Sequence, residues 1–368
     1  MQLIEPELVE RFAADLAALW SPDERAGPLG LAVSGGPDSL ALLLLAHAAM
    51  PGQIAVASVD HGLRPEAAGE VALVEQICAA RAVPFTALSV SLAPGNLQAQ
   101  ARAARYAALE QWAQARSLGA LATAHHADDQ AETLLLRLNR GSGLAGLAGV
   151  RAASLLEASE LLLLRPLLGW RKAELEAVVA AAGITPARDP SNDNHDFDRV
   201  KLRARLAESD WLDVRALATS AGHIAEGWRA IEWYAGLDWD DMVHPDETRA
   251  DGEPGLVYYA NVPRVIAIET LCRIISELGG HCTRAEAGRA FDRLWRGEKA
   301  SLGGVLAVPG IERMKAIGIA MRCWRVAPEP ARRIPGRGCV ARPLPPPGPR
   351  GSVRRPPLRP HPAAGCPR

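Results

Sequence analysis

Short apolar segments alternate with longer helix-length segments through the first half of this chain. The apolar segments lie at 31–33, 54–59, 85–90 and 120–124. Because their apolar residues are consecutive and do not alternate with polar ones, they indicate strands buried on both faces. The pattern therefore predicts an α/β fold, a doubly wound parallel sheet with helices on both sides.

The stretch 31–45, LAVSGGPDSLALLLL, joins the first predicted strand to a helix through a glycine turn. Such a connection leaves backbone N–H groups at the positive end of a helix, which favours an anion. Hydroxyl and carboxylate groups in the turn suit phosphate and Mg²⁺. The expected nucleotide-binding residues are Ser34, Gly35, Gly36, Pro37, Asp38 and Ser39. The Walker pattern is not met, and an ordinary strand-to-helix turn is the alternative.

Two other polar clusters follow the ends of predicted strands, Asp60 after the second and HHADDQAET, 125–133, after the fourth. Parallel sheets bind ligands at the carboxyl ends of their strands. We therefore expect Asp38, Asp60 and Asp129 to lie together, where a divalent cation is the natural partner, with Asp38 as the metal ligand.

A helix that begins near Asp128 places Asp129 and Glu132 on one face. The spacing of His125 and His126 does not match a zinc HExxH motif, so a histidine here donates a hydrogen bond or a proton. For Asp128 and His126 a purely structural role, such as a helix cap, stays open.

Two further segments carry basic residues or glycines near these clusters. Arg102 and Arg105, with Tyr106, are one helical turn apart and suit phosphates or a carboxylate substrate, or else an exposed helix face. The glycine-rich segment 140–149 is either a hinge or lid over the site or a flexible connector.

The rest of the chain predicts a basic helix, a helical connector and a small domain. The basic helix carries Arg199, Lys201, Arg203 and Arg205. The tryptophans at 211, 228, 233 and 239 are spaced as core residues of helices. The expected division is a catalytic domain at 1–210, a helical connector at 211–261, a small domain at 262–330 and a disordered tail at 331–368.

Charge is distributed unevenly along the 368 residues. The net charge is −1, but residues 331–368 hold nine Arg, eleven Pro and no Asp, Glu or Lys, so the remainder carries a net charge of about −10. An acidic body must bind nucleic acid through local basic patches. Six cysteines without a CxxC pair, and no signal peptide or membrane span, predict a cytoplasmic protein.

The order of several motifs resembles the bacterial tRNA(Ile)-lysidine synthases, a family of the PP-loop ATP pyrophosphatase superfamily with a Rossmann-like fold. SGGPDS is typical of the superfamily, whereas the combination with DHGLRPEAAGE, ARAARY and HHADDQAETLLLRLNRGSGLAGLAG is specific to the family. RPLL and DPSNDNHDFDRVKLRARL follow in the same order, although the family usually has Asn where this chain has Val200.

The resemblance implies an ATP- and Mg²⁺-dependent ligase that adenylates the wobble cytidine of the CAU-anticodon isoleucine tRNA and then attaches free L-lysine to C2. It implies that Asp38, Arg105, His125, Asp129 and Glu132 are catalytic, with Glu132 binding the lysine ammonium. Arg199, Lys201 and Arg203 would contact tRNA phosphates, and the small domain would help to recognise the tRNA. Asp60 would contact the metal or the nucleotide. The oligomeric state stays open, with a homodimer as one possibility.

Two other functions remain open from the sequence. A PP-loop tRNA thiolase would also adenylate a base, but it needs a cysteine at the site, and Cys78 stands alone in a predicted helix. A nucleotide-binding module without catalysis is the alternative from another class. ATP- and tRNA-dependent pyrophosphate release with lysine incorporation separates the three.

Overall fold

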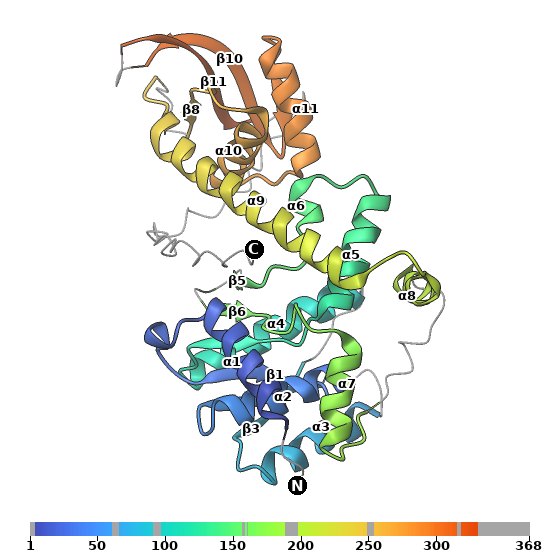
Figure 1. Ribbon diagram of the computed structural model, residues 1–368. Coiled ribbons are helices and arrows are strands. Elements are labelled where there is room, and N and C mark those ends of the chain that lie inside the picture. The colour runs from blue at the N-terminus through green and yellow to red at the C-terminus, as the bar shows by residue number, and fades with distance from the viewer. Residues whose placement is uncertain are drawn as a thin grey trace, which may run out of the picture. The chain divides into compact units, whose positions relative to one another are not determined.

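A six-stranded sheet forms the centre of the N-terminal part of the chain in the computed structural model (Figure 1). The structure describes residues 4–60, 66–90, 97–156, 159, 161–187, 198–248, 254–314 and 318–329. These residues divide into two units, Met1–Ala230 and Ile231–Arg368. The 331–368 tail, expected to be disordered, lies outside the described residues.

The order of the first sheet is β3-β2-β1-β4-β6-β5, and all its pairs are parallel except β5 with β6. Its strands are β1 (Leu29–Ala32), β2 (Ile54–Asp60), β3 (Phe85–Ser89), β4 (Ala120–Ala122), β5 (Ala153–Leu155) and β6 (Leu162–Leu164). The helices that begin in this unit are α1 (Pro6–Leu19), α2 (Pro37–Ala49), α3 (Glu66–Ala79), α4 (Leu97–Ala115), α5 (Ala127–Asn139), α6 (Leu144–Leu147), α7 (Lys172–Ala181), α8 (Asp198–Glu208) and α9 (Val214–Met242). The predicted doubly wound parallel sheet is confirmed.

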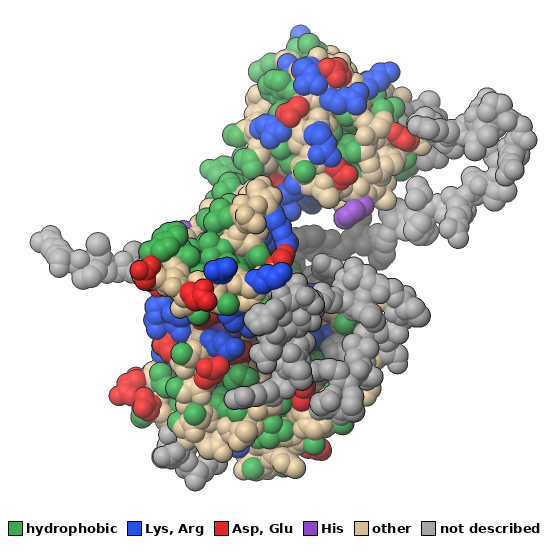
Figure 2. Space-filling view, turned by 90° about the vertical axis from the view of Figure 1, so that its right-hand side faces the viewer, with side chains coloured by type: hydrophobic (Ala, Val, Ile, Leu, Met, Phe, Trp, Pro, Cys, Tyr) green, Lys and Arg blue, Asp and Glu red, His purple; other side chains and the backbone are tan. Residues whose placement is uncertain are grey.

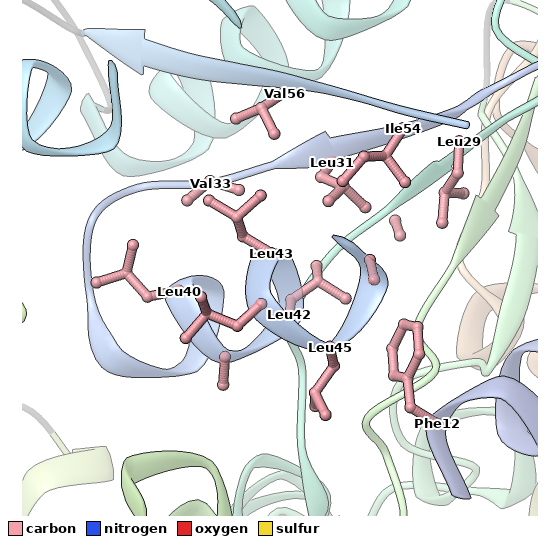
Figure 3. Close-up of a cluster of buried hydrophobic side chains, with 14 of the residues drawn as sticks. Phe12, Leu29, Leu31, Val33, Leu40, Leu42, Leu43, Leu45, Ile54 and Val56 are labelled. Carbon is pink, nitrogen blue, oxygen red and sulfur yellow. The ribbon is translucent and has the colours of Figure 1, made fainter. Parts of the chain in front are cut away.

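The two faces of the central strands carry side chains of different size. Leu29, Leu31 and Val56 point toward α2, where they pack on Leu42 and Leu43 in one buried cluster (Figure 3). The alternate positions Gly30, Ala32, Ala55 and Ala57 are small, and α4 packs on that face through Leu109 and Trp112. Because successive strand residues point to opposite faces, this size difference lets a helix approach closely on one side.

The second unit is an antiparallel sheet with the order β7-β8-β11-β10-β9 and two helices (Figure 1). Its elements are β7 (Val243–Pro245), β8 (Leu256–Tyr258), α10 (Arg264–Glu277), α11 (Arg284–Trp295), β9 (Ala300–Leu302), β10 (Val305–Arg313) and β11 (Ala320–Pro328). Leu271, Ile275, Phe291 and Leu294 of the helices pack against Trp324 of the sheet. The Thr283–Glu286 capping box starts α11.

Part of the segment 211–261, expected to be a helical connector, is strand instead. β8 pairs with β11, and β7 pairs with β8. These pairs satisfy backbone groups along the edge of β11 that would otherwise be left without hydrogen bonds. The second sheet therefore begins upstream of residue 262.

The expectation that the tryptophans of 211–245 are core residues is only partly met. Trp228 is buried with Ala221 and Ala235, which are seven residues away on the same stripe of α9. Trp233 lies off this stripe and is 42% exposed, while Trp211 precedes the helix and is 80% exposed. Tryptophan spacing alone did not reveal which stripe of the helix faces the core.

Substitution of Gly30 tests whether α4 packs closely on the sheet. A Cβ at this position would lie 2.7 Å from Leu118 Cδ1 and 3.0 Å from Trp112 Cζ3. We expect Gly30→Val to lower the free energy of unfolding by about 1–3 kcal/mol through overpacking. Urea unfolding measures this, with an unchanged m-value as the sign of a pure stability effect. Gly169→Ala, where the added Cβ meets nothing within 4 Å, is the control; equal effects of the two would contradict the packing argument.

Candidate active site

The turn between β1 and α2 is shaped by its glycines and two serines. Gly35 has a φ of +85°, a left-handed conformation that glycine adopts without strain. The Ser34 N–H donates to Ser39 Oγ at 3.1 Å, and the Ser39 hydroxyl donates to the Gly36 carbonyl at 3.0 Å. Gly36 is the N-cap of α2 and provides no side-chain cap. The first turn of α2 therefore presents backbone donors to an anion.

A cleft opens at the carboxyl ends of β1 and β4, which pair in parallel. It brings together six of the predicted site residues with Arg105, and its full lining is Ala32, Ser34, Gly36, Asp38, Ser39, Arg105, Thr123, Ala124, His125 and Asp129. The predicted approach of the glycine turn and the HHADDQAET cluster at one sheet edge is therefore what the structure has, and Arg105 of α4 joins them there.

Asp38 has one carboxylate oxygen available for a ligand. Its Oδ2 lies 3.6 Å from His126 Nε2. Its Oδ1 is buried and accepts no hydrogen bond from any described residue. Buried polar atoms normally have partners, so this oxygen suits a cation or a donor that the protein itself does not supply.

His126 is the N-cap of α5 and organises the carboxylates around it. Its ring is buried, with 4% of the residue exposed, and the His126 N–H donates to Asp129 Oδ2 at 3.2 Å. In the neutral ring Nδ1 accepts from the Asp129 N–H at 3.4 Å, whereas in the imidazolium both ring nitrogens are donors that face carboxylates. Burial disfavours the imidazolium, but the hydrogen bond to Asp38 and the charges of Asp129, Asp38 and Asp128 outweigh it and raise the pKa of His126. The structural role that the sequence left open is a helix cap.

The pKa of His125 is shifted in the opposite direction to that of His126. Its Nδ1 lies 3.0 Å from Thr123 Oγ1. Burial, together with the charges of Arg165, Arg102 and Arg105, lowers the pKa of His125 to about 4 against the opposing charge of Asp129. His125 is therefore neutral near pH 7 and can donate or accept one hydrogen bond within the cleft.

Glu132 and Arg203, predicted to bind a lysine ammonium and tRNA phosphate, are paired with each other. The Glu132 side chain is 2% exposed, and Arg203 donates to it through Nε at 2.8 Å and Nη2 at 3.4 Å. Arg199 of the same helix, α8, donates to Thr133 Oγ1 at 3.3 Å. Glu132 is thus a buried anion that requires a cation, and in this structure the cation is Arg203.

Asp128 is held by structural contacts. It accepts from the Lys172 N–H at 2.8 Å and from Arg171 Nη2 at 3.1 Å. Burial alone would raise the pKa of Asp128, but these hydrogen bonds lower it. Asp128 therefore caps α7, not its own helix as the sequence suggested, and has little freedom to bind a ligand.

Asp60 ends β2, beside β1, but it is absent from the lining of the cleft. The segment that follows it, 61–65, lies outside the described residues, as does the Asp- and Asn-rich 188–197. The structure thus brings Asp38 and Asp129 into the cleft and leaves Asp60 outside its lining.

The glycine-rich segment 140–149 is attached to α5. Gln130 Nε2 donates to the Val150 carbonyl at 2.8 Å, and its Oε1 accepts from the Val150 N–H at 2.7 Å. Arg137 donates to the carbonyl of Gly146, which lies in α6. Gly149 has a φ of +65°, and a Cβ there would lie 2.3 Å from Gln130 Oε1. These contacts argue against a flexible connector, one of the two alternatives that the sequence left open.

Thr123 and Arg165 are site residues that pattern reasoning did not single out. Thr123 lines the cleft, and Arg165 follows the end of β6 directly. The rule that ligands lie at the carboxyl ends of parallel strands would have found both. No cluster of three metal-binding side chains occurs among the described residues, and no described helix is long and apolar enough to cross a membrane.

Several known proteins are similar to this chain. A family profile described as a PP-loop domain matches residues 8–209. A tRNA(Ile)-lysidine synthase of Novosphingobium aromaticivorans is 46% identical over 298 residues, 80% of this chain and 89% of that protein. One of Zymomonas mobilis is 41% identical over 318 residues, 84% and 93% of the two chains. The structure of the U34-tRNA thiolase NcsA from Methanococcus maripaludis has a TM-score of 0.49 at 13% identity, covering 60% of this chain and 79% of that one.

The parallel sheet and the glycine turn at the end of β1 define a PP-loop protein, in agreement with the matching profile. Identities of this size over nearly whole chains are more specific than the fold. The chain belongs to the tRNA(Ile)-lysidine synthase family.

The raised pKa of His126 predicts a pH-dependent contribution to stability. A folded-state pKa above the unfolded value stabilises the protein fully below about pH 6.5, and the contribution is lost as the pH rises through the folded value. We expect His126→Asn, which keeps an N-cap side chain, to be more destabilising at pH 6 than at pH 9. Chemical unfolding of both proteins at the two pH values measures it. A difference that is independent of pH would contradict the proposed charge state.

Proposed function

We propose that this protein ligates free L-lysine to C2 of the wobble cytidine in a CAU-anticodon isoleucine tRNA, which changes decoding from AUG to AUA. First, O2 of the cytosine attacks the α-phosphorus of ATP, and pyrophosphate leaves. The ε-amine of lysine then attacks C2, AMP leaves, and the amine loses a proton. The name of the relatives, tRNA(Ile)-lysidine synthase, and the chemistry of the cleft support this proposal.

The observation that carries the proposal is one cleft in which an anion-binding turn, an arginine and two carboxylates lie together. Ser34, Gly36 and Ser39 supply the donors that a pyrophosphate leaving group needs. Arg105 adds a positive charge for the phosphate under attack. ATP is accordingly the proposed nucleotide.

Mg²⁺ fits the donors of this cleft. Asp38 has a buried oxygen without a hydrogen-bond partner, and Mg²⁺ is commonly held by one or two carboxylates plus substrate phosphates. Asp38, with Asp129 as a second ligand, would hold the ion. When bound, it neutralises phosphate charge.

Two carboxylates of α5 suit the amine of lysine. Asp129 lines the cleft, so it can accept a hydrogen bond from an ammonium group and take a proton from it. Glu132 lies one helical turn further on and is satisfied by Arg203. An ammonium can reach Glu132 only after Arg203 moves. Neutral His125, with its pKa of about 4, contributes a hydrogen bond instead of a charge.

The helix α8 supplies the local basic patch expected for tRNA contact. Lys201 is exposed, and Arg199 and Arg203 lie on the same helix. On the face of the second unit seen at the top of Figure 2, Lys and Arg are interleaved with Asp and Glu, so no uniformly basic field covers it. Local contacts of this kind suit unstacked anticodon bases better than long-range attraction does.

A thiolase is less well supported by the described residues. The described cysteines are Cys78, Cys272, Cys282 and Cys323, and none lines the cleft. Cys78 is buried in the core, where burial raises the pKa of its thiol to about 11, which opposes nucleophilic use. Free thiols and a tRNA substrate also fit a cytoplasmic location.

The decisive assay follows pyrophosphate release and the transfer of labelled lysine. We expect pyrophosphate only when ATP and the isoleucine tRNA are both present, and label in the tRNA when lysine is added. ATP turnover without tRNA, or a tRNA without label, would contradict the proposal. No turnover at all would favour a nucleotide-binding module.

Substitution of Asp38 tests the proposed adenylation step most directly. We expect Asp38→Asn to reduce tRNA-dependent pyrophosphate release by at least about 100-fold, the range seen when one electrostatic partner of a transition state is removed. Binding of tRNA, measured by filter retention, stays unchanged. Asp23→Asn, an exposed carboxylate in the 3₁₀ turn Pro22–Glu24, is the control. If Asp38→Asn keeps full activity, Asp38 has a structural role and takes no part in adenylation.

Lys201 tests the tRNA surface without disturbing the Glu132–Arg203 pair. Removing one phosphate contact lowers the slope of log affinity against log salt by about 1. We therefore expect Lys201→Gln to weaken tRNA binding at low salt and to flatten its salt dependence, while the exposed Arg116→Gln leaves both unchanged. If the slope for Lys201→Gln is the same as for the unaltered protein, Lys201 does not contact a tRNA phosphate and the tRNA contact lies outside α8.

A further inference from the structure

Three arginines form a cluster beside the cleft, and we call Arg102, Arg105 and Arg165 the arginine cluster. Arg102 and Arg105 lie on α4, whose Tyr106 packs on the sheet core. Arg165 lies just past the end of β6, next to the residue that follows β4, since the Thr123 N–H donates to the Leu164 carbonyl at 3.0 Å. Strand pairing and helix packing thus place all three next to His125.

Tyr106 connects two members of the cluster. The Arg102 guanidinium carbon lies 5.0 Å from the centroid of the Tyr106 ring, and the hydroxyl of Tyr106 is hydrogen-bonded to Arg165. Arg165 Nη1 also donates to the Arg151 carbonyl at 2.6 Å and to Ser154 Oγ at 3.2 Å. These contacts hold the Arg165 side chain in one orientation.

The cluster carries positive charge that the described part of the protein does not neutralise. No described carboxylate forms an ion pair with any of the three arginines, and the groups acting on Arg105 and Arg165 are Tyr106 and Arg102. Arg165 is only 6% exposed, and its Nε has no hydrogen-bond partner among the described residues. Buried cations without an anion are costly, so an anionic ligand is the natural partner.

We propose that Arg102 and Arg165 of the arginine cluster bind the carboxylate of the amino acid substrate, with Arg165 as the residue that fixes its position while the amine end lies toward Asp129. This inference rests on the proposed function. It names a subsite that selects a free amino acid over a simple amine of the same length.

The charges in the cleft favour an amino acid over another phosphate. Arg105 and Asp129 line the same cleft, and His125 lies within the field of both. A zwitterion matches such paired opposite charges, whereas a backbone phosphate would be repelled by Asp129. The phosphates of ATP already have the donors of the turn that begins α2 and the charge of Arg105, so Arg102 and Arg165 are left for the carboxylate. Arginine is also the side chain whose geometry best matches a carboxylate.

The test compares L-lysine with 1,5-diaminopentane, which has the same amine but no carboxylate. Transfer of each labelled acceptor to tRNA is measured for the unaltered protein, Arg102→Gln, Arg165→Gln and Arg165→Lys. Arg116→Gln, an exposed arginine just after α4, is the matched control. Pyrophosphate release in a single turnover without acceptor reports the adenylation step separately.

We expect the unaltered protein to have a lower KM for lysine than for the diamine by about tenfold or more, the worth of one charge-assisted hydrogen bond. Arg102→Gln and Arg165→Gln raise the KM for lysine toward that for the diamine, whose KM does not change. Arg165→Lys retains part of the preference, because the charge remains without the fork of donors. Adenylation and the KM for ATP stay as in the control.

Three outcomes overturn the inference: an unaltered protein without preference for lysine, variants that impair both acceptors equally, and variants that raise the KM for ATP. Thermal unfolding shows whether Arg165→Gln is folded, and exposed Arg102 keeps the test valid if it is not. If the unaltered protein transfers neither acceptor, the proposed function fails instead, and the two failures are therefore distinguishable.

Discussion

The parallel pairing of β1 with β4 is the constraint on which the site depends. Leu31 lies opposite Ala122, so both strands end at the same edge of the sheet. The glycine turn continues from one strand and the two histidines continue from the other. Helix α2 begins at the first end and α5 at the second, and their first turns face a common cleft. A change in this register would separate Asp38 from Asp129 without altering either residue.

The register is secured by packing on both faces of the sheet. Large side chains on the α2 face fill the core seen in Figure 3, and small residues on the α4 face let that helix come close. The close approach of α4 brings Arg105 to the cleft and Arg102 beside it. The same feature that stabilises the fold therefore supplies the cations of the site.

Charged side chains at and beside the cleft pair with one another. His126 lies among Asp38, Asp128 and Asp129, and Arg203 neutralises Glu132. Buried carboxylates require such partners. The Arg203–Glu132 pair links the basic helix α8 to α5. The arginine cluster differs because no described carboxylate balances it.

The sequence by itself determined the strands, the glycine turn and the family resemblance, because these depend on local spacing and on residues that are adjacent in the chain. It could predict that Ser34–Ser39 and 125–132 approach each other, since parallel strands end at one edge. Only the tertiary structure decided which side chains pair there. Asp128 caps α7 and Glu132 binds Arg203, contacts between residues 44 and 71 positions apart that no local pattern contains. It also showed that β7 and β8 complete the second sheet, because a strand's partner is set by which sheet edge has open hydrogen bonds.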